Sequence, residues 1–442
     1  MNPASTTRRT FLKQTTAAGM AGVSSLSLVR GAHAAGEGTI KVGMIGCGGR
    51  CSGAAHQALH AGKDVKLVAM TDIFEDRARG ARDRLKSRMG DQVDVSDDNL
   101  HWDFEGYRKV IDAADVVLIA CASKFHPMYA EAAVKAGKHV FVEKPHGIDP
   151  MGVRRMQAAC DLARQKGLSI VSGLHSRFDL GWQETIKRLQ EGAIGEITSI
   201  QSMYLRGPYQ LVRRNPKLSE TEYQFSNWYH FRWLSGDDVT QSLVHNLDRC
   251  LWLLGERKPE WCFGLGGRSA SFGEVYGDMY DHDTVVYEYP ERDGKPAMRI
   301  YAMCRTQNGC YGNGSDIIVG TKGTCYLGQK RIVGESEWRY RGPRRNAYQE
   351  EQDALIESVR QGKPFNSGDY MAGSTMMAVM GQLATYTGAR TTWTDIEPAP
   401  LRFGPAPEES SFETPPPSTP DATGNYPLPM PGITQLSTFT VK

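Results

Sequence analysis

The chain shows two different patterns of hydrophobic and polar positions, and the first extends from residue 38 to residue 172. Short apolar runs of the kind that form buried strands alternate there with stretches whose apolar positions recur at helical spacing. The expected strands are 40–45, 65–70, 116–120, 139–142 and 168–171. Strands and helices that alternate in this way predict an α/β fold, in which helices cover both faces of a parallel sheet.

The second pattern covers residues 173–397, where strands follow one another after a single helix at 182–191. The expected strands are 197–204, 284–289, 298–303, 315–319 and 324–327. Asp293-Gly294 marks a hairpin turn between two of them. This pattern predicts an α+β domain with a large, mainly antiparallel sheet. Such a sheet usually has one face free for another subunit, so we expect a homodimer or homotetramer.

The end of the chain differs from both patterns. Two helices are expected at 347–361 and 370–386, and the methionines of the second are more typical of core packing than of a binding surface. From residue 398 prolines are frequent, as in Thr414-Pro415-Pro416-Pro417. Residues 398–442 are therefore expected to form an extended arm that wraps a neighbour or stays mobile.

The first 34 residues have the composition of a targeting segment. Arg8-Arg9 precede a mildly apolar stretch, and Ala32-His33-Ala34 provides the small residues that a signal peptidase cleaves after. We interpret this as a twin-arginine export signal, which predicts a periplasmic or otherwise exported protein. A basic disordered tail is the alternative. The segment is too short and too weakly apolar for a permanent membrane span.

Composition and charge exclude several classes of protein. The chain of 442 residues has a formal net charge of +2, so it has no basic field that would favour nucleic acid as a partner. Nine cysteines without a C-x-x-C pair argue against a disulfide framework and against a zinc site, and we expect no metal. Whether one disulfide forms among Cys304, Cys310 and Cys325 is left open by the sequence.

The sequence KVGMIGCGGRCSG, which begins at Lys41, places a glycine-rich turn directly after the first strand. Gly46 and Gly48 fill the first two glycine positions of a dinucleotide-binding turn, and Cys51 stands at the third. Asp72 follows the second strand, where a carboxylate accepts both ribose hydroxyls and repels a 2'-phosphate. The turn therefore predicts NAD as cofactor rather than NADP, although Arg77 could turn towards a phosphate. An ordinary glycine-rich bend is the alternative.

The sequence AGKHVFVEKPHG, from Ala136 to Gly147, ends a predicted strand in Glu143-Lys144-Pro145. With the glycine turn, Asp72 and His245 in the same order, the chain resembles the glucose-fructose oxidoreductase and inositol dehydrogenase family (Gfo/Idh/MocA). The resemblance implies a Rossmann NAD-binding domain at 38–172 and a substrate domain at 173–397. It implies cofactor contacts from the residues Gly46, Gly48, Gly49, Arg50, Asp72, Cys121, His126, Glu143, Lys144 and Arg177.

Lys144 is the first of two predicted catalytic residues. A lysine at the carboxyl end of a strand, fixed by the following proline, lies in the crevice where open α/β sheets bind ligands. Its ammonium can bind the substrate oxygen and stabilise charge there as hydride leaves the carbon. A surface salt bridge with Glu143 is the structural alternative.

His245 is the second predicted catalytic residue, in the sequence from Gly236 to Asp248. On a helix, Gln241, His245 and Asp248 would share one face. In the family the histidine acts as general base with an aspartate four residues earlier, but this chain has Gln241 there. We expect His245 to abstract the proton alone and Gln241 to bind a substrate hydroxyl. A satisfied core histidine is the alternative.

Further substrate contacts are expected from the aromatic run between Asn227 and Trp233. Tyr229 and Arg232 belong to it, and such rings stack on the C–H faces of a sugar. Packing between the domains is an equal alternative.

Export combined with a nicotinamide cofactor restricts the function, because no free NAD pool is expected outside the cytoplasm. The sequence therefore predicts an oxidoreductase that acts on a sugar or polyol hydroxyl with a tightly bound, recycled cofactor. An NAD-dependent glycosidase that works by transient oxidation and elimination is one alternative. A non-catalytic NAD-binding sugar sensor is the other.

Overall fold

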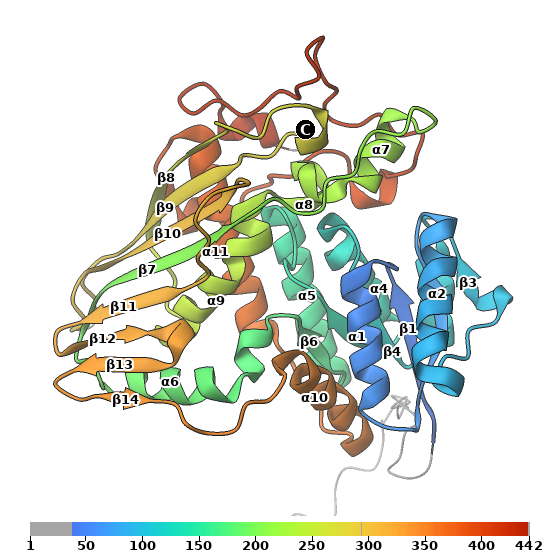
Figure 1. Cartoon of the computed structure of the whole chain (residues 1–442), viewed down its shortest axis with the longest axis horizontal. Helices are drawn as coiled ribbons and strands as arrows, with labels where there is room; N and C mark the ends of the chain where they lie inside the picture. The colour runs from blue at the N-terminus through green and yellow to red at the C-terminus, as the bar shows by residue number, and fades with distance from the viewer. Residues whose placement is uncertain (1–37, 293, 441–442) are drawn as a thin grey trace, which may run out of the picture.

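The structure is a computed structural model that describes residues 38–292 and 294–440 (Figure 1). The predicted export signal lies outside these residues, as does Asp293 of the expected hairpin turn. Two sheets, one at each side of the molecule, are separated by a layer of helices (Figure 1). The predicted combination of a Rossmann-like sheet with a second, mostly antiparallel sheet is confirmed.

The first sheet has six parallel strands in the order β3-β2-β1-β4-β5-β6. Their bounds are β1 Ile40–Ile45, β2 Val65–Thr71, β3 Leu100–His101, β4 Val116–Ile119, β5 His139–Val142 and β6 Ile170–Ser172. The strand order reverses between β1 and β4. In an open α/β sheet this reversal creates the crevice in which ligands bind.

Helices cover both faces of this sheet. Buried side chains of α1 (Gly49–His60), α2 (Glu75–Met89) and α10 (Ala347–Gln361) form the core on one face. The other face is covered by α3 (Gly106–Ala113), α4 (His126–Lys135) and α5 (Pro150–Lys166). The helix α10 comes from the last quarter of the chain and packs beside α1, so the second half of the sequence completes the first domain.

The second sheet has nine strands in the order β14-β13-β12-β11-β7-β10-β9-β8-β15. Their bounds are β7 Ile197–Arg206, β8 Trp261–Gly267, β9 His282–Tyr289, β10 Met298–Thr306, β11 Asp316–Gly320, β12 Gly323–Tyr326, β13 Arg331–Gly334, β14 Trp338–Arg339 and β15 Thr391–Thr392. All pairs are antiparallel except the central one, β7 with β10. The predicted mainly antiparallel sheet is confirmed, and its parallel pair arises because the helical segment between β7 and β8 carries the chain over to the far side of the sheet.

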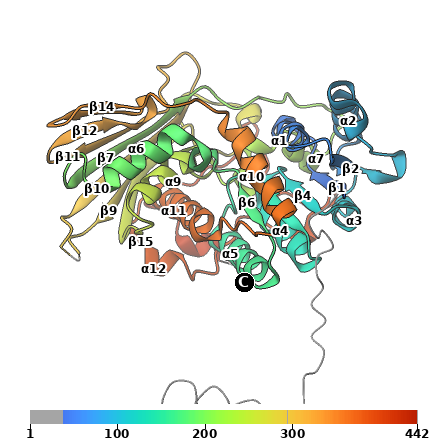
Figure 2. The same cartoon turned by 90° about the horizontal axis from the view of Figure 1, so that it is seen from below.

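Helices cover only one face of the second sheet. They are α6 (Leu180–Gln190), α9 (Val244–Leu253) and α11 (Gly368–Thr387), which lie below the strands in Figure 2. The expected methionine cluster of α11 is buried in this layer. Cys262 of β8 points towards α11, where its thiol contacts the Met380 carbonyl, whereas the next residue, Phe263, is exposed on the open face.

Residues 398–440 pack along their own chain, contrary to the expectation of a mobile or neighbour-wrapping arm. Glu408 pairs with Arg155 of α5. Further on, Gln224 in α7 (Glu220–Ser226) donates 2.8 Å to the Ser418 carbonyl, and Tyr426 donates 2.6 Å to Glu220. The arm thus joins the two domains.

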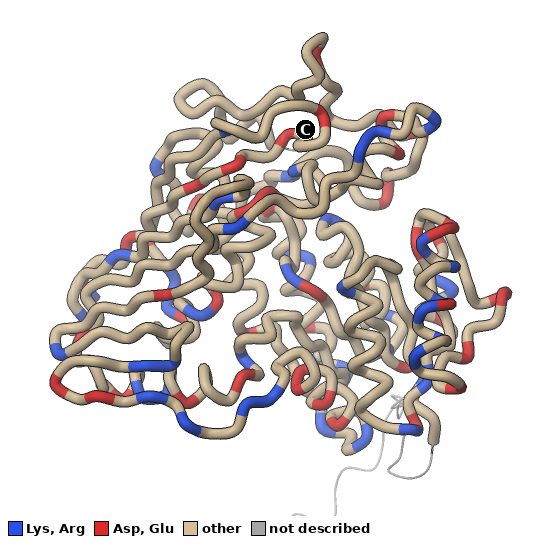
Figure 3. The backbone as a smooth tube through the Cα atoms, viewed as in Figure 1, with Lys and Arg blue, Asp and Glu red and all other residues tan. Residues whose placement is uncertain are grey.

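Three further features agree with the composition. All nine cysteines are free thiols, so the bridge left open above does not form. Basic and acidic residues are interspersed along the backbone (Figure 3). Within residues 38–292 and 294–440 no helix is both long and apolar enough to cross a membrane.

Candidate active site

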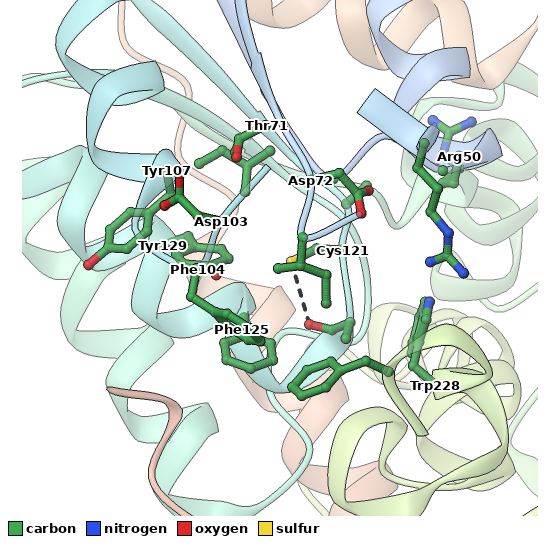
Figure 4. A pocket seen from close by; sticks show the side chains of 18 of the residues that line it. Arg50, Thr71, Asp72, Asp103, Phe104, Tyr107, Cys121, Phe125, Tyr129 and Trp228 are labelled. Atoms are coloured by element: carbon green, nitrogen blue, oxygen red, sulfur yellow. Dashed lines mark hydrogen bonds between the residues drawn. The ribbon is translucent and has the colours of Figure 1, made fainter. Parts of the chain in front are cut away.

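A cleft of about 810 Å³ opens at the carboxyl ends of β1, β2 and β4. Its walls come from the glycine turn, from Asp72, and from residues that follow β4, including Cys121. Trp228 and Tyr229 of the second domain close the far side, and Trp228 rises towards Arg50 in Figure 4.

The glycine turn is shaped for an anionic ligand. Gly46 has φ of +91°, and a side chain there would meet the Ala120 carbonyl oxygen at 2.6 Å, so the protein itself requires this glycine. At Gly48 and Gly49, by contrast, an added Cβ would meet no atom within 4 Å. Their bare backbone borders the cleft at the start of α1, which has no side-chain cap. An uncapped helix N-terminus favours a phosphate, so the turn fits a dinucleotide.

Cys51 replaces the third glycine without disturbing the packing. The side chain is fully buried between α1 and the sheet, where its thiol contacts the carbonyls of Ile45 and Leu118. The departure from the glycine pattern therefore lies on the packing side of the turn, away from the phosphate position.

Asp72 lies at the end of β2 with its carboxyl at the cleft. It accepts hydrogen bonds from the backbone of Cys47 at 2.7 Å and of Phe74 at 3.1 Å. Burial raises its pKa, and these two N–H groups oppose that shift. Arg77 also borders the cleft, but its guanidinium stacks on Phe74 and donates 2.9 Å to the Ser226 carbonyl. The position of Asp72 fits a ribose, and Arg77 is already engaged.

Arg50 and Glu143 connect the cleft to a buried charge cluster. Arg50 pairs with Glu143 and, at 3.1 Å, with Glu351 of α10, and its guanidinium lies over the Tyr348 ring. Glu143 also accepts a hydrogen bond from the Lys144 backbone. The Glu143 carboxylate therefore positions Arg50 and the Lys144 backbone and is not directed at a cofactor.

Lys144 follows β5, and its peptide bond to Pro145 is cis. Its ammonium donates 2.9 Å to the Gln241 carbonyl rather than pairing with Glu143. Burial lowers the Lys144 pKa, and the positive charges of Arg206 and Arg50 lower it further. The structure thus rejects the surface salt bridge considered above.

The segment around His245 differs from the expected regular helix. Residues Val239–Leu243 form a π-helical turn before α9. The Gln241 amide donates to Ser123 and, at 2.9 Å, to the Ser235 carbonyl. Asp248 binds Arg177 and Ser374. Asp248 thus anchors the helix, and the Gln241 amide nitrogen is bonded within the fold instead of being free for a substrate hydroxyl as expected.

His245 lies close to Lys144, and the positive charge of Lys144 acts on its ring. The His245 ring is 8% exposed and its Nδ1 has no hydrogen-bond partner among the described residues. Burial lowers its pKa well below the ordinary value, and the neighbouring charges of His175, Lys144 and Arg249 contribute. Because Lys144 donates to the Gln241 carbonyl one turn before His245, the two predicted catalytic groups lie close together, at a corner next to the cleft residue Arg50 and its partner Glu143.

The comparisons with known proteins agree with this geometry. Residues 40–173 match the Gfo/Idh/MocA model, an oxidoreductase family with an NAD-binding Rossmann fold. The match spans the first domain, from β1 to just past β6. Among curated relatives, a myo-inositol 2-dehydrogenase of Thermotoga maritima is 24% identical over 74% of this chain and 90% of its own length. An inositol 2-dehydrogenase of Rhizobium meliloti is 25% identical over 67% of this chain and 77% of its own.

Solved structures show the same fold. The apo scyllo-inositol dehydrogenase of Lactobacillus casei has a TM-score of 0.60 at 20% identity and covers 81% of this chain and 99% of its own. GenD2 from gentamicin A biosynthesis, solved in complex with NAD, has a TM-score of 0.59 at 19% identity and covers 80% and 97%. With the family match, the relatives make this chain an NAD(P)-dependent oxidoreductase.

Several predicted contact residues of the oxidoreductase have structural partners instead. Arg177 is held by Asp248 and Glu256, each at 2.8 Å. Arg232 pairs with Asp278 at 2.9 Å and is not directed at the cleft. His126 is buried between the carbonyls of Cys121 and Pro145. Side chains with such partners could not be told from ligand contacts in the sequence, because every partner except Cys121, five positions before His126, lies 19 or more positions away.

Tyr229 and Cys121 do border the cleft. Tyr229 is stacked between Trp228 and Tyr209, with ring centroids 3.8 and 4.2 Å apart. The two readings of the aromatic run thus apply together, since its rings pack between domains and also form one wall of the site.

Four residues of the corner were missed in the sequence. His175 follows β6, Arg206 ends β7, and Tyr348 and Glu351 lie near the start of α10. Burial and the Glu143 charge raise the Glu351 pKa, and its Oε2 has no partner among the described residues. His175 stood two positions before the noted Arg177, but no local pattern linked any of the four to Lys144.

Proposed function

We propose that the protein is an NAD-dependent dehydrogenase of a sugar or polyol that retains its cofactor between turnovers. The observation that carries the proposal is the position of Lys144 and His245 next to the cleft. Arg50, which lines the cleft beside the glycine turn, pairs with Glu143, and the following residue, Lys144, lies close to His245.

Asp72 supports NAD over NADP. Its carboxyl is fixed by two backbone N–H groups at the cleft, where a 2'-phosphate would bring a second negative charge. Arg77, the group that would favour NADP, is bonded to the Ser226 carbonyl across the domain boundary. NAD, when bound, supplies the acceptor for the hydride.

Lys144 and His245 have complementary roles in this proposal. The Lys144 ammonium donates a hydrogen bond to the oxygen of the substrate alcohol and stabilises negative charge as the O–H bond breaks. The neutral His245 imidazole accepts the proton, and its lowered pKa keeps it unprotonated near neutral pH. The C–H bond on the same carbon then gives up its hydride.

A sugar or polyol is proposed as the substrate because the curated relatives are named inositol dehydrogenases. Polar atoms without partners at the corner suit a hydroxyl-rich ligand. The Nδ1 atoms of His175 and His245 and Nε of Arg206 are buried without hydrogen-bond partners among the described residues, and burial of such atoms is costly unless a ligand satisfies them.

The C-terminal arm supports cofactor retention. Phe412 packs edge-on against Phe104 at 5.0 Å and Phe225 at 6.0 Å, both of which line the cleft. The arm thereby backs the cleft wall and joins the two domains at the ligand. Retention suits an exported enzyme, and we propose export through the twin-arginine pathway on the basis of Arg8-Arg9.

A second subunit is proposed on the open face of the nine-stranded sheet. Phe263 and Leu265 are 41% and 72% exposed there, and Phe263 adjoins Val286, which in turn adjoins Tyr301. An apolar sheet face of this kind favours association of two copies. Sedimentation equilibrium of the wild-type protein and of Leu265→Lys tests it, and a monomeric wild type contradicts it.

Cofactor extraction tests the proposed function. Protein from its natural compartment should release NAD(H) on denaturation, identified by mass spectrometry, and the held cofactor should be reduced by at least one compound in a panel of inositols and hexoses. Turnover of nitrophenyl glycosides without added NAD would favour the glycosidase instead. A site with no affinity for NAD would contradict both enzymes.

A further inference from the structure

His175 lies where the His245 side chain lacks the acidic partner expected from the resemblance. The Gln241 amide is bonded to Ser123 and Ser235, so it does not reach the His245 ring. The His175 and His245 rings instead meet edge to face, with centroids 5.0 Å apart and planes inclined by 65°. His175 also stacks on Tyr348 of α10 at 4.3 Å, which fixes its ring plane.

Both rings have unused hydrogen-bonding capacity. Nδ1 of His175 and Nδ1 of His245 are buried without a partner among the described residues. Burying a polar atom without a partner destabilises the fold, so two such atoms at one corner indicate a function.

We propose that His175 and His245 act as a proton-accepting pair, in which His245 takes the proton of the substrate hydroxyl and His175 takes it over from His245. This inference rests on the proposed dehydrogenase function. The O–H bond breaks with its proton going to the His245 ring, and the C–H bond gives its hydride to the nicotinamide nucleotide as the C=O bond forms. The proton then moves to His175, which returns it to water.

The charges around the two rings give the transfer its direction. The groups that act on His245 are His175, Lys144, Arg249 and His146, and all of them oppose a positive charge there. His175 faces Arg249, Arg50 and Lys144 as well, but it also faces the Glu143 carboxylate, which favours the charged form. Burial lowers the His175 pKa to about 4. His175 is therefore the better place for the proton.

The remaining neighbours do not reverse this asymmetry. Arg206 lies on the Lys144 side and is paired with Asp238 at 2.8 Å. On α9, Asp248 is neutralised by Arg177. On α10, burial and the Glu143 charge raise the Glu351 pKa, which favours the neutral form of this carboxyl. A neutral carboxyl neither favours nor opposes a proton on His175.

His175→Gln tests the pair, with His60→Gln on the exposed end of α1 as the matched control. Glutamine keeps hydrogen-bonding groups but cannot hold the proton. We expect the variant to keep its fold and its bound cofactor, and to lose about 10²-fold in kcat with little change in KM. We also expect the acidic limb of its pH–rate profile to move to higher pH, since the charge of His175 no longer opposes protonation of His245.

Nitrogen-15 NMR of protein labelled in its histidine rings gives a readout that does not depend on turnover. In the wild type, the signals of His175 and His245, assigned by His175→Gln and His245→Gln, should respond to one shared protonation step. In His175→Gln, the His245 signal should titrate at higher pH, because the charge of His175 no longer opposes a proton there. Independent titrations, or kcat and pH profiles unchanged by His175→Gln, would overturn the pair while leaving the dehydrogenase intact. A wild-type protein that oxidises no member of the panel would instead contradict the proposed function.

Discussion

The cleft and the catalytic corner next to it are built in different ways. In the cleft, the groups placed for the phosphates and the ribose are backbone groups of one short segment and the carboxylate of Asp72, 25 positions after Cys47. At the catalytic corner, Lys144, His175, His245 and Tyr348 come from four segments of the chain. The nucleotide end would bind its ligand with backbone groups and one carboxylate, whereas the corner depends on side chains that tertiary packing brings together.

The cleft and the corner also differ in electrostatics. The nucleotide end carries one buried acid and open glycines. The corner is surrounded by buried ion pairs, including Arg50 with Glu351 and Arg249 with Asp316. Pairs of this kind fix geometry rather than add stability, because desolvation offsets most of their attraction. The corner should therefore be sensitive to single substitutions and the nucleotide end more tolerant.

Lys144→Ala should produce the largest effect on chemistry. Loss of the ammonium removes the group that stabilises the substrate oxygen, so hydride transfer should slow by about 10²–10⁴-fold. Single-turnover reduction of the bound cofactor measures it. The control is Lys66→Ala on the half-exposed side of β2. A rate within twofold of wild type would show that Lys144 is only structural.

Asp248→Asn should affect stability before activity. It leaves the buried Arg177 with only the partly exposed Glu256, and breaking one side of a buried pair costs about 3–5 kcal/mol. Urea unfolding measures the loss. Glu75→Gln, which breaks an exposed pair with Arg79, should cost less than about 1 kcal/mol. If the Asp248→Asn protein is as stable as the wild type but has an altered KM for the substrate, Asp248 contacts the substrate.

Asp72→Ser should change cofactor choice at the nucleotide end. Without the carboxylate, NAD binding should weaken by about tenfold, or about 1.4 kcal/mol, and NADP binding should strengthen. Calorimetric titration of cofactor-free protein with each nucleotide measures both, with Asp76→Ser on exposed α2 as control. Unchanged preference would mean that Asp72 does not contact the ribose.

Phe412→Ala should have the smallest effect of the four. It removes edge-on contacts behind the cleft wall, each worth about 0.5–1.5 kcal/mol, so NAD(H) should dissociate several-fold faster. Stopped-flow displacement measures the rate. Ile433→Ala, in the same arm but 68% exposed, is the matched control and should leave dissociation unchanged. Equal rates of NAD(H) dissociation for the two variants would show that the arm does not contribute to cofactor retention.

The sequence by itself determined the first sheet, the glycine turn and the position of Lys144. Buried parallel strands are continuous apolar runs, and a strand end followed by a glycine or a proline places its residues at the ligand edge whatever surrounds it. The predicted strands of the first domain accordingly agree with β1, β2, β4 and β5 within one residue at either end. These features depend on neighbours in the chain.

Only the tertiary structure decided which polar side chains are free. Gln241, Arg177 and Arg232 looked like ligand contacts, yet each has a partner within the fold. His175 and Tyr348 looked ordinary, yet packing stacks them at the corner, 173 positions apart in the chain. The energy of a buried polar group depends on what lies opposite it, and that neighbour is set by the packing of distant segments.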